Sequence, residues 1–289
     1  MKPLGSYLCG KVRLSPQILR YIPQHRVYCE PFFGMGAVFF KKGFYKTKNI
    51  KDYIEVIGDI DGDVTNFLKQ LRDFPDLVIK EISKMECSSN LHKLSDTRSN
   101  YYKKSNKIKQ ASLFYFNVST GIFGLKNDSF LFSVRKNAKN VPLTLKNKVS
   151  MLKQVSERLR NCYIVDWGYE KTIEKTDLDD TFFYLDPPYK DTHKYDKQGS
   201  FDYDLFADKV KELRGKFALS HYDNEWVRKN FDNDNYFIYD LSHTPSVGKT
   251  ENNNRVSGKQ FTKEVLITNY DVEKTPLWTD IPKDSILFT

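Results

Sequence analysis

Two strand–turn–helix units follow one another near the start of the chain, and this order restricts the fold more than any other feature. Apolar residues 27–29 lead through a glycine-containing turn into a short helical pattern over 37–42. A second apolar run, 53–57, precedes residues 64–71, whose apolar side chains fall on one face of a helix. Successive units of this kind predict a doubly wound α/β fold with a mainly parallel sheet.

A basic and aromatic segment then interrupts the α/β pattern. Residues 81–150 contain 13 Lys and Arg against four acidic residues, a net charge of +9 that equals the formal charge of the whole 289-residue chain. Aromatic runs at 101–102, 114–116 and 130–132 alternate with the basic residues. Basic groups suit phosphate contacts and rings suit base stacking, so the segment predicts nucleic-acid contact. The same rings could instead form a small core of the segment itself.

The α/β pattern resumes near residue 150. A helical pattern over 149–159 is followed by apolar runs typical of strands at 162–165, 181–185, 217–219, 236–239 and 265–267. We therefore expect a discontinuous α/β domain formed by residues 1–75 and 150–289. A mostly helical domain over residues 76–149 would be inserted into it.

Composition excludes several classes of protein. The four cysteines lie far apart without a Cys-x-x-Cys pair, so neither a zinc site nor a disulfide framework is indicated. None of them follows a proline, which argues against the covalent methylation of a cytosine ring carbon. No apolar run approaches the roughly 20 residues of a membrane span. We expect a cytoplasmic protein with neither a metal nor a membrane partner.

The tetrapeptide Asp186-Pro187-Pro188-Tyr189 is the most specific chemical signal, because it follows a buried apolar strand. Its carboxylate and the Pro187 carbonyl can each accept one hydrogen bond from a planar amine, and the fixed φ of the prolines holds both acceptors in place. Tyr189 could then stack on the base. This geometry favours methyl transfer to an exocyclic amine, and the target base would have to leave the duplex stack to reach it.

Gly34 and Gly36 predict a ligand site after the first strand, since glycines let the backbone approach a nucleotide-like ligand. Asp59 follows the next strand, where an acid commonly binds ribose hydroxyls. A nicotinamide-dependent oxidoreductase would share these features. However, Phe39 stands where the dinucleotide fingerprint has its third glycine, which favours an adenosine ligand without a pyrophosphate.

Taken together, these segments resemble the Dam-type DNA adenine methyltransferases, which carry the Asp-Pro-Pro-Tyr (DPPY) motif. The resemblance spans nearly the whole chain. The matching segments, in chain order, are Tyr7-Leu8-Cys9-Gly10-Lys11, Glu30 to Phe40, Gly58-Asp59-Ile60, Phe183 to Tyr189, Leu219 to Asp223 and Glu264 to Tyr270.

The resemblance implies a Rossmann-like catalytic domain that uses S-adenosylmethionine, with the basic insertion as its target-recognition domain. Its catalytic residues would be Asp186, Pro187, Pro188 and Tyr189. Its cofactor-binding residues would be Tyr7, Lys11, Glu30, Phe32, Gly34, Gly36, Asp59, Ile60, Asp166 and Asp186. The expected reaction is site-specific methylation of N6 of an adenine flipped out of double-stranded DNA. A companion restriction endonuclease would be compatible with this class.

The expected DNA contacts are Asn117, Lys126, Arg135, Lys249 and Arg255. Many relatives have Asn-Arg and Phe-Asn-Gly in the recognition domain, where this chain has Asn117-Val118 and Ile122-Phe123-Gly124. A GATC target is therefore not predicted.

Three alternative functions stay open at this point. The chain could be a non-catalytic nucleic-acid-binding module. It could also methylate N4 of cytosine or an adenine in RNA, because the same acceptor geometry serves each of these amines.

Overall fold

A seven-stranded sheet forms the centre of the structure, a computed structural model that describes residues 11–42, 52–136, 138, 140–190, 201–241 and 263–278. The strand order is β3-β2-β1-β4-β5-β7-β6. In chain order the strands are β1 (Val27–Glu30), β2 (Ile54–Gly58), β3 (Cys162–Val165), β4 (Thr181–Leu185), β5 (Lys216–Tyr222), β6 (Phe237–Leu241) and β7 (Glu264–Thr268). The first five strands pair in parallel, and β7 runs antiparallel to both β5 and β6. The predicted α/β, Rossmann-like sheet is confirmed.

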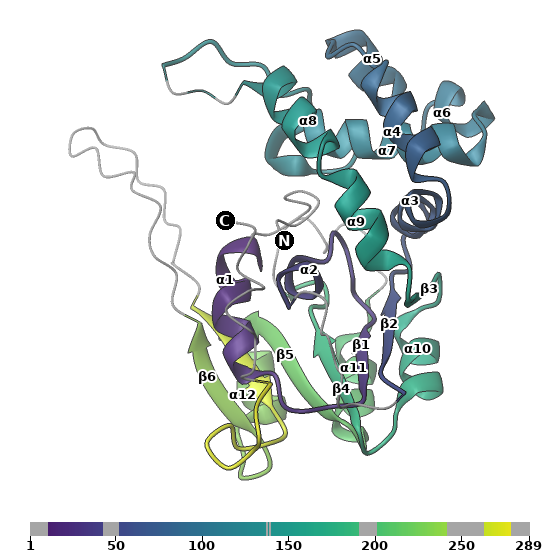
Figure 1. The fold of residues 1–289 in the computed structure, drawn as a ribbon. Helices are drawn as coiled ribbons and strands as arrows, with labels where there is room; N and C mark the ends of the chain where they lie inside the picture. Colours follow the sequence, from purple (N-terminus) through teal and green to yellow (C-terminus); the bar gives the residue numbers. More distant parts are fainter. Residues whose placement is uncertain are drawn as a thin grey trace, which may run out of the picture.

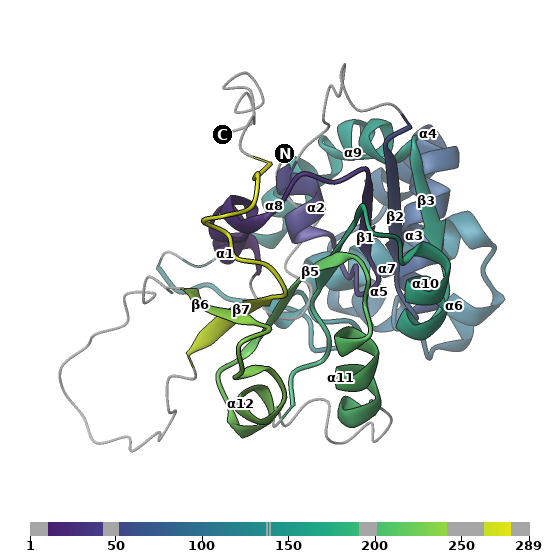
Figure 2. The same ribbon diagram turned by 90° about the horizontal axis from the view of Figure 1, so that it is seen from below.

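Helices cover both faces of the sheet and make three layers (Figures 1 and 2). Side chains alternate across a strand, so neighbouring residues such as Phe182 and Phe183 enter opposite cores. One face packs against α1 (Lys11–Ile18), α2 (Ala37–Lys42), α3 (Gly62–Asp73) and α9 (Leu152–Leu159). The other face packs against α10 (Tyr169–Thr176), α11 (Tyr203–Lys211) and α12 (Glu225–Phe231).

A helical layer lies beyond α3 and α9, at the upper right of Figure 1. It consists of α4 (Pro75–Ser83), α5 (Ser89–Leu94), α6 (Asn100–Lys104), α7 (Lys107–Thr120) and α8 (Val141–Val149). A short 3-10 turn, η2 (Ile122–Gly124), follows α7, and another, η1 (Leu19–Tyr21), follows α1. Side-chain oxygens of Ser88, Ser99, Asn106 and Asn140 accept backbone N–H groups at the starts of α5 to α8. These caps explain why a polar, lysine-rich stretch forms short helices.

Helix α7 joins the helical layer to the α/β core, because every residue from Ala111 to Thr120 is buried. The ring of Phe67 on α3 stacks on that of Tyr115 on α7, with centroids 4.9 Å apart and an angle of 11° between the ring planes. The rings of Phe114, Tyr115 and Phe116 therefore fill a shared interior, whereas Tyr101 and Phe132 are exposed. None of the helices in the described part of the chain combines the length and the apolar character needed to span a bilayer.

Phe67→Ala should lower the free energy of unfolding by about 3 to 5 kcal/mol, because it removes a fully buried ring and leaves a cavity between α3 and α7. Denaturant titration of both proteins measures this change. Leu77→Ala on α4 is the control, since that side chain is 51% exposed and its loss should change stability by less than about 0.5 kcal/mol. Equal effects of the two substitutions would contradict the shared core.

Candidate active site

The expected site motifs lie at one edge of the sheet because they follow neighbouring parallel strands. Strand β1 pairs with β2 on one side and with β4 on the other. Gly34 and Gly36 follow β1, Asp59 follows β2 and Asp186 follows β4. The carboxyl ends of parallel strands point the same way, so these loops gather at the edge of the sheet where the ligand crevice of doubly wound folds lies.

The turn after β1 requires glycine at two positions. Gly34 and Gly36 have φ angles of 51° and 66°, in the left-handed region. A Cβ atom added to Gly36 would lie 2.3 Å from the ring of Phe33, so no other residue fits this turn without displacing that ring. The turn therefore presents backbone rather than side chains toward the crevice.

Asp59 ties the glycine turn to the next strand. Its carboxylate accepts hydrogen bonds from the backbone N–H of Gly34 and of Asp61, both at 2.8 Å. Burial raises the pKa of Asp59 to about 6, although the two backbone donors oppose this shift. The next residue, Ile60, is 80% exposed and offers an apolar surface beside the acid.

A buried polar cluster surrounds the catalytic motif. Lys11, the first described residue, contacts the side chains of Tyr189 and Glu264, and its Nζ lies 3.3 Å from Oδ1 of Asp186. The Tyr189 hydroxyl donates to Glu264 Oε1 at 2.6 Å. Burial alone would lower the pKa of Lys11, but the carboxylates of Asp186 and Glu264 outweigh it and raise that pKa. The lysine is therefore held as a cation between two acids.

Asp186 is oriented from the neighbouring strand. Ser220 on β5 donates to its Oδ1 at 3.1 Å, and the Ser220 hydroxyl is also 3.1 Å from the hydroxyl of Tyr184. Burial raises the pKa of Asp186, and the attraction of Lys11 offsets part of this effect. The Asp186 side chain is still 24% exposed, whereas the following Pro187 is buried. A partly accessible acceptor is thus held rigidly at the strand end.

Tyr189 packs inside the protein at this point. Its ring lies 4.8 Å from that of His221 and 4.7 Å from that of Tyr222, and the residue is only 6% exposed. Pro188 is half-buried between Pro187 and this ring. Tyr189 therefore contacts Lys11 and Glu264 as a structural part of the cluster.

Two further candidates border the crevice. Glu30 at the end of β1 is buried and accepts a hydrogen bond from Tyr28 at 2.8 Å, and burial raises its pKa well above the usual range. Phe32 stacks on Tyr169 with ring centroids 5.4 Å apart. Both residues sit beside the glycine turn.

Asp166 and the expected DNA contacts take different positions. The Asp166 side chain is 59% exposed after β3 and pairs with Lys69 at 3.2 Å. Arg135 is exposed in the loop after η2, close in sequence to the exposed Phe132 and Val134. Tyr7, Lys249 and Arg255 lie outside the described residues.

Asn117 and Lys126 are engaged within the protein. Asn117 is 1% exposed, and its side chain bonds the Ser95 hydroxyl and the backbone of Asn127, so the structure places it in the interior rather than on a DNA-facing surface. Lys126 is ion-paired with Asp61 and Asp63. The sequence pattern assigned both side chains to DNA contacts. In the structure, Asn117 is buried and Lys126 is ion-paired within the protein.

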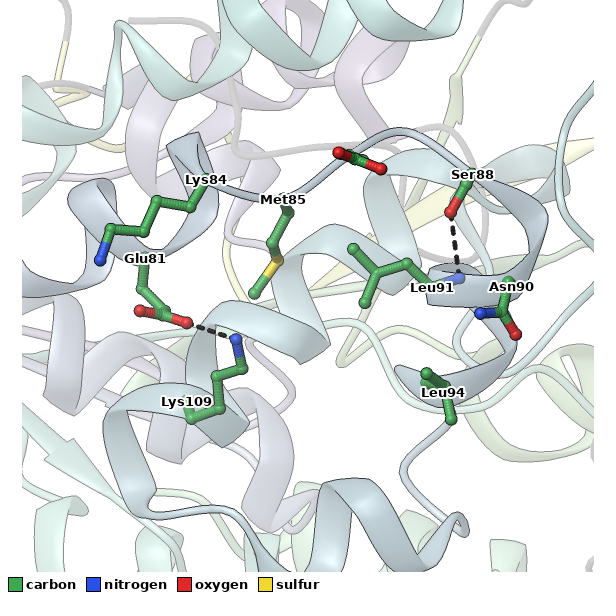
Figure 3. Close-up of a pocket in the computed structure, with 9 residues that line it drawn as sticks. Glu81, Lys84, Met85, Ser88, Asn90, Leu91, Leu94 and Lys109 are labelled. Atoms are coloured by element: carbon green, nitrogen blue, oxygen red, sulfur yellow. Dashed lines mark hydrogen bonds and ion pairs between the residues drawn. The ribbon is translucent and has the colours of Figure 1, made fainter.

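Two hollows in the helical layer are separate from the crevice. One has a volume of about 320 Å³, and Figure 3 shows the Glu81–Lys109 ion pair at its wall. The other, about 280 Å³, includes His92, which bonds Thr120 and the Asp128 carbonyl. None of their lining residues belongs to the motifs after β1, β2 or β4.

Sequence reasoning missed the roles of Glu264 and Ser220. Glu264 is the first residue of β7 and precedes the apolar residues Val265 to Ile267. An isolated acid next to an apolar strand is the feature of the sequence that could have indicated its role. Because β7 runs antiparallel to β5, with Glu264 opposite Tyr222, its first residue meets the carboxyl end of the parallel strands. Ser220 is an isolated hydroxyl in the buried strand β5.

A glycine turn after β1, an acid after β2 and Asp-Pro-Pro-Tyr after β4 together point to an amino-methylating transferase. Comparison with known proteins agrees. Residues 7–253 match the model of the D12 class N6 adenine-specific DNA methyltransferase family, and the chain belongs to this family. It is therefore an enzyme that methylates adenine in DNA.

Three named relatives align with much of the chain. The Type II methyltransferase M1.LlaDCHI of Lactococcus lactis subsp. cremoris is 24% identical over 93% of this chain and 96% of its own length. The Type II methyltransferase M.MjaIII of Methanocaldococcus jannaschii is 29% identical over 67% of this chain and 71% of its own. A DNA adenine methylase of Vibrio cholerae is 25% identical over 62% of each chain.

Lys11→Met should lower the free energy of unfolding by about 3 to 5 kcal/mol, because it leaves the carboxylates of Asp186 and Glu264 in the interior without their cation. Thermal and denaturant unfolding measure the loss. Lys69→Met removes the exposed pair with Asp166 and should change stability by less than about 1 kcal/mol. A stability of Lys11→Met equal to that of the control would contradict the buried cluster.

Proposed function

We propose that the methyl donor is S-adenosylmethionine, bound over the crevice between β1, β2 and β4. The backbone of the Gly34–Gly36 turn lies against the ligand, and the Asp59 carboxylate accepts hydrogen bonds from its ribose hydroxyls. When bound, this cofactor supplies an electrophilic methyl group. The observation that carries the proposal is the position of Asp186 and the glycine turn after adjacent parallel strands.

Asp186 and Pro187 bind the amine that is methylated. The Asp186 carboxylate and the Pro187 carbonyl each accept one N–H of the adenine amino group, and Ser220 and Lys11 hold the carboxylate in place. Hydrogen bonds to both acceptors draw the two N–H bonds toward the protein. The nitrogen lone pair thereby leaves conjugation with the base and can attack the methyl group in line with the carbon–sulfur bond that breaks. The adenine reaches this crevice by leaving the duplex stack.

The helical insertion, residues 76–149, is the target-recognition domain. Its net positive charge suits the phosphate backbone of double-stranded DNA, and Arg135, which is exposed, is the proposed contact. Two relatives are named Type II methyltransferases. By analogy we infer a site-specific enzyme that acts beside a companion restriction endonuclease. Sequencing of genomic DNA from an expressing host would identify the methylated base and its sequence context.

Asp186→Ala should lower the rate constant of methyl transfer by roughly a hundredfold to a thousandfold or more, because one of the two amine acceptors is lost. Transfer of labelled methyl groups to DNA measures the rate. Asp179→Asn, an exposed acid just before β4, is the matched control and should retain full activity. Equal transfer by the wild type and by Asp186→Ala would end the proposed mechanism and favour a role in DNA binding alone.

Cofactor affinity should fall as the pH drops below about 6. The ribose hydroxyls donate to ionised Asp59, whose pKa is about 6, so protonation of this acid competes with binding and costs up to about tenfold in affinity per pH unit. Calorimetric titration with S-adenosylmethionine between pH 5 and 8 measures the effect. Asp59→Asn cannot titrate and should bind more weakly at pH 8, with a flatter profile. Identical profiles for the two proteins would exclude this role of Asp59.

A further inference from the structure

Lys126 lies where the helical insertion meets the loop that follows β2. It comes just after η2, and its Nζ contacts Asp61 and lies 3.2 Å from Oδ2 of Asp63. Its side chain is 23% exposed, and those of its two partners are 22% and 27% exposed. One lysine from the insertion is therefore ion-paired with two acids of the catalytic domain at a partly buried contact.

The contact continues to the glycine turn through a chain of hydrogen bonds. Asp61 caps α3 by accepting the N–H of Asp63 at 3.0 Å, and its own N–H donates to Asp59 at 2.8 Å. The other oxygen of Asp59 accepts the N–H of Gly34 at 2.8 Å. Every link between Lys126 and the glycine turn is therefore a direct hydrogen bond or ion pair.

A second arm reaches the same loop from α6. The Tyr102 hydroxyl donates to Oδ1 of Asp63 at 2.7 Å, while Lys126 contacts the other oxygen of that carboxylate. The two arms hold Asp63 from different elements of the insertion, so its carboxylate is fixed in one orientation.

The segment that carries Lys126 is itself held by hydrogen bonds to the rest of the insertion. Its neighbour Asn127 has a φ of 60°, and its backbone N–H donates to the buried side chain of Asn117 at 2.7 Å. The Asn127 side chain in turn accepts the N–H of Thr97 at 2.9 Å. These bonds give the buried Asn117 a purpose within the protein, which is to hold the turn from which Lys126 extends.

We propose that Lys126 is a positioning residue of the cofactor site, which acts through Asp61 and Asp63 on Asp59 and the glycine turn, and that it is not a DNA contact. The inference rests on the proposed function, because it takes the cofactor to bind beside Asp59. It makes the insertion a support for cofactor binding as well as a recognition domain.

The charges around Asp59 add a pH effect to this geometric role. The groups facing it are Asp61, which raises its pKa, and Lys126, which lowers it, with Asp63 and Tyr102 paired just beyond. Without the lysine, the two neighbouring acids would oppose ionisation of Asp59. Loss of Lys126 should therefore move the acidic limb of cofactor binding to higher pH, which a purely structural role would not do.

The test compares S-adenosylmethionine affinity by calorimetry for the wild type, Lys126→Met and Lys126→Arg. Lys126→Met should bind about tenfold or more weakly at pH 7.5, with its acidic limb shifted upward, since it loses charge-assisted hydrogen bonds. Lys126→Arg should retain most of the affinity, because its guanidinium can bridge both carboxylates. Lys109→Met, which removes a comparably exposed pair within the insertion, is the control and should bind like the wild type.

A double substitution separates charge from folding. Adding Asp61→Asn to Lys126→Met removes the carboxylate charge that Lys126 offsets in the wild type, and it should recover part of the affinity and return the acidic limb toward that of the wild type. Unchanged cofactor affinity and an unshifted limb in a folded Lys126→Met protein would overturn the inference.

Salt dependence of DNA binding without cofactor gives the second readout. Lys126→Met should keep the wild-type slope of log K against log salt, whereas loss of a phosphate contact would reduce it by about 0.9. A reduced slope would assign Lys126 to DNA and overturn the inference. If the wild type itself did not bind S-adenosylmethionine, the proposed function would fail first, and the inference would fall with it.

Discussion

The position of β1 between β2 and β4 is the constraint on which the site depends. Three loops that are far apart in the sequence leave the sheet at the same edge because these strands are parallel neighbours. The glycine turn, Asp59 and Asp186 then need only local geometry to face one crevice. Any change in strand order would separate Asp186, the proposed amine acceptor, from the glycine turn proposed to bind the cofactor, whatever the motifs themselves contained.

Charge compensation is the second requirement, because the crevice concentrates acids. Burial raises the pKa of Glu30, of Asp59 and of Asp186 and so favours their protonated, neutral forms. A protonated carboxyl group is a weaker hydrogen-bond acceptor than a carboxylate. Lys11 opposes this shift at Asp186 from α1, and Lys126 opposes it at Asp59 from the insertion. The two cations come from segments before and between the motifs, so the acids depend on parts of the chain outside the βα units that carry them.

The sequence predicted the elements that local pattern controls. The strand at 181–185, the helical face at 64–71 and the turn at Gly34 and Gly36 follow from hydrophobic period and residue type, and the structure contains each of them. The buried pairing of Glu55 on β2 with Arg158 on α9 did not follow, because it depends on how a helix crosses the sheet. The same holds for Glu264, whose place opposite Tyr222 is set by the antiparallel pairing of β7.

The sequence analysis expected Asn117 and Lys126 to contact DNA, and their contacts within the protein could not be predicted for a related reason. A polar residue in a basic segment has the same appearance in sequence whether it faces DNA or supports the fold, since net charge reports composition and not direction. The Asn117 side chain bonds a turn with a positive φ at Asn127, and Lys126 pairs with Asp61 and Asp63, which precede it by 65 and 63 residues. The insertion thus places only part of its charge on its surface. Lys126 instead joins the insertion to the start of α3, so the insertion and the proposed cofactor loop after β2 form parts of one connected structure.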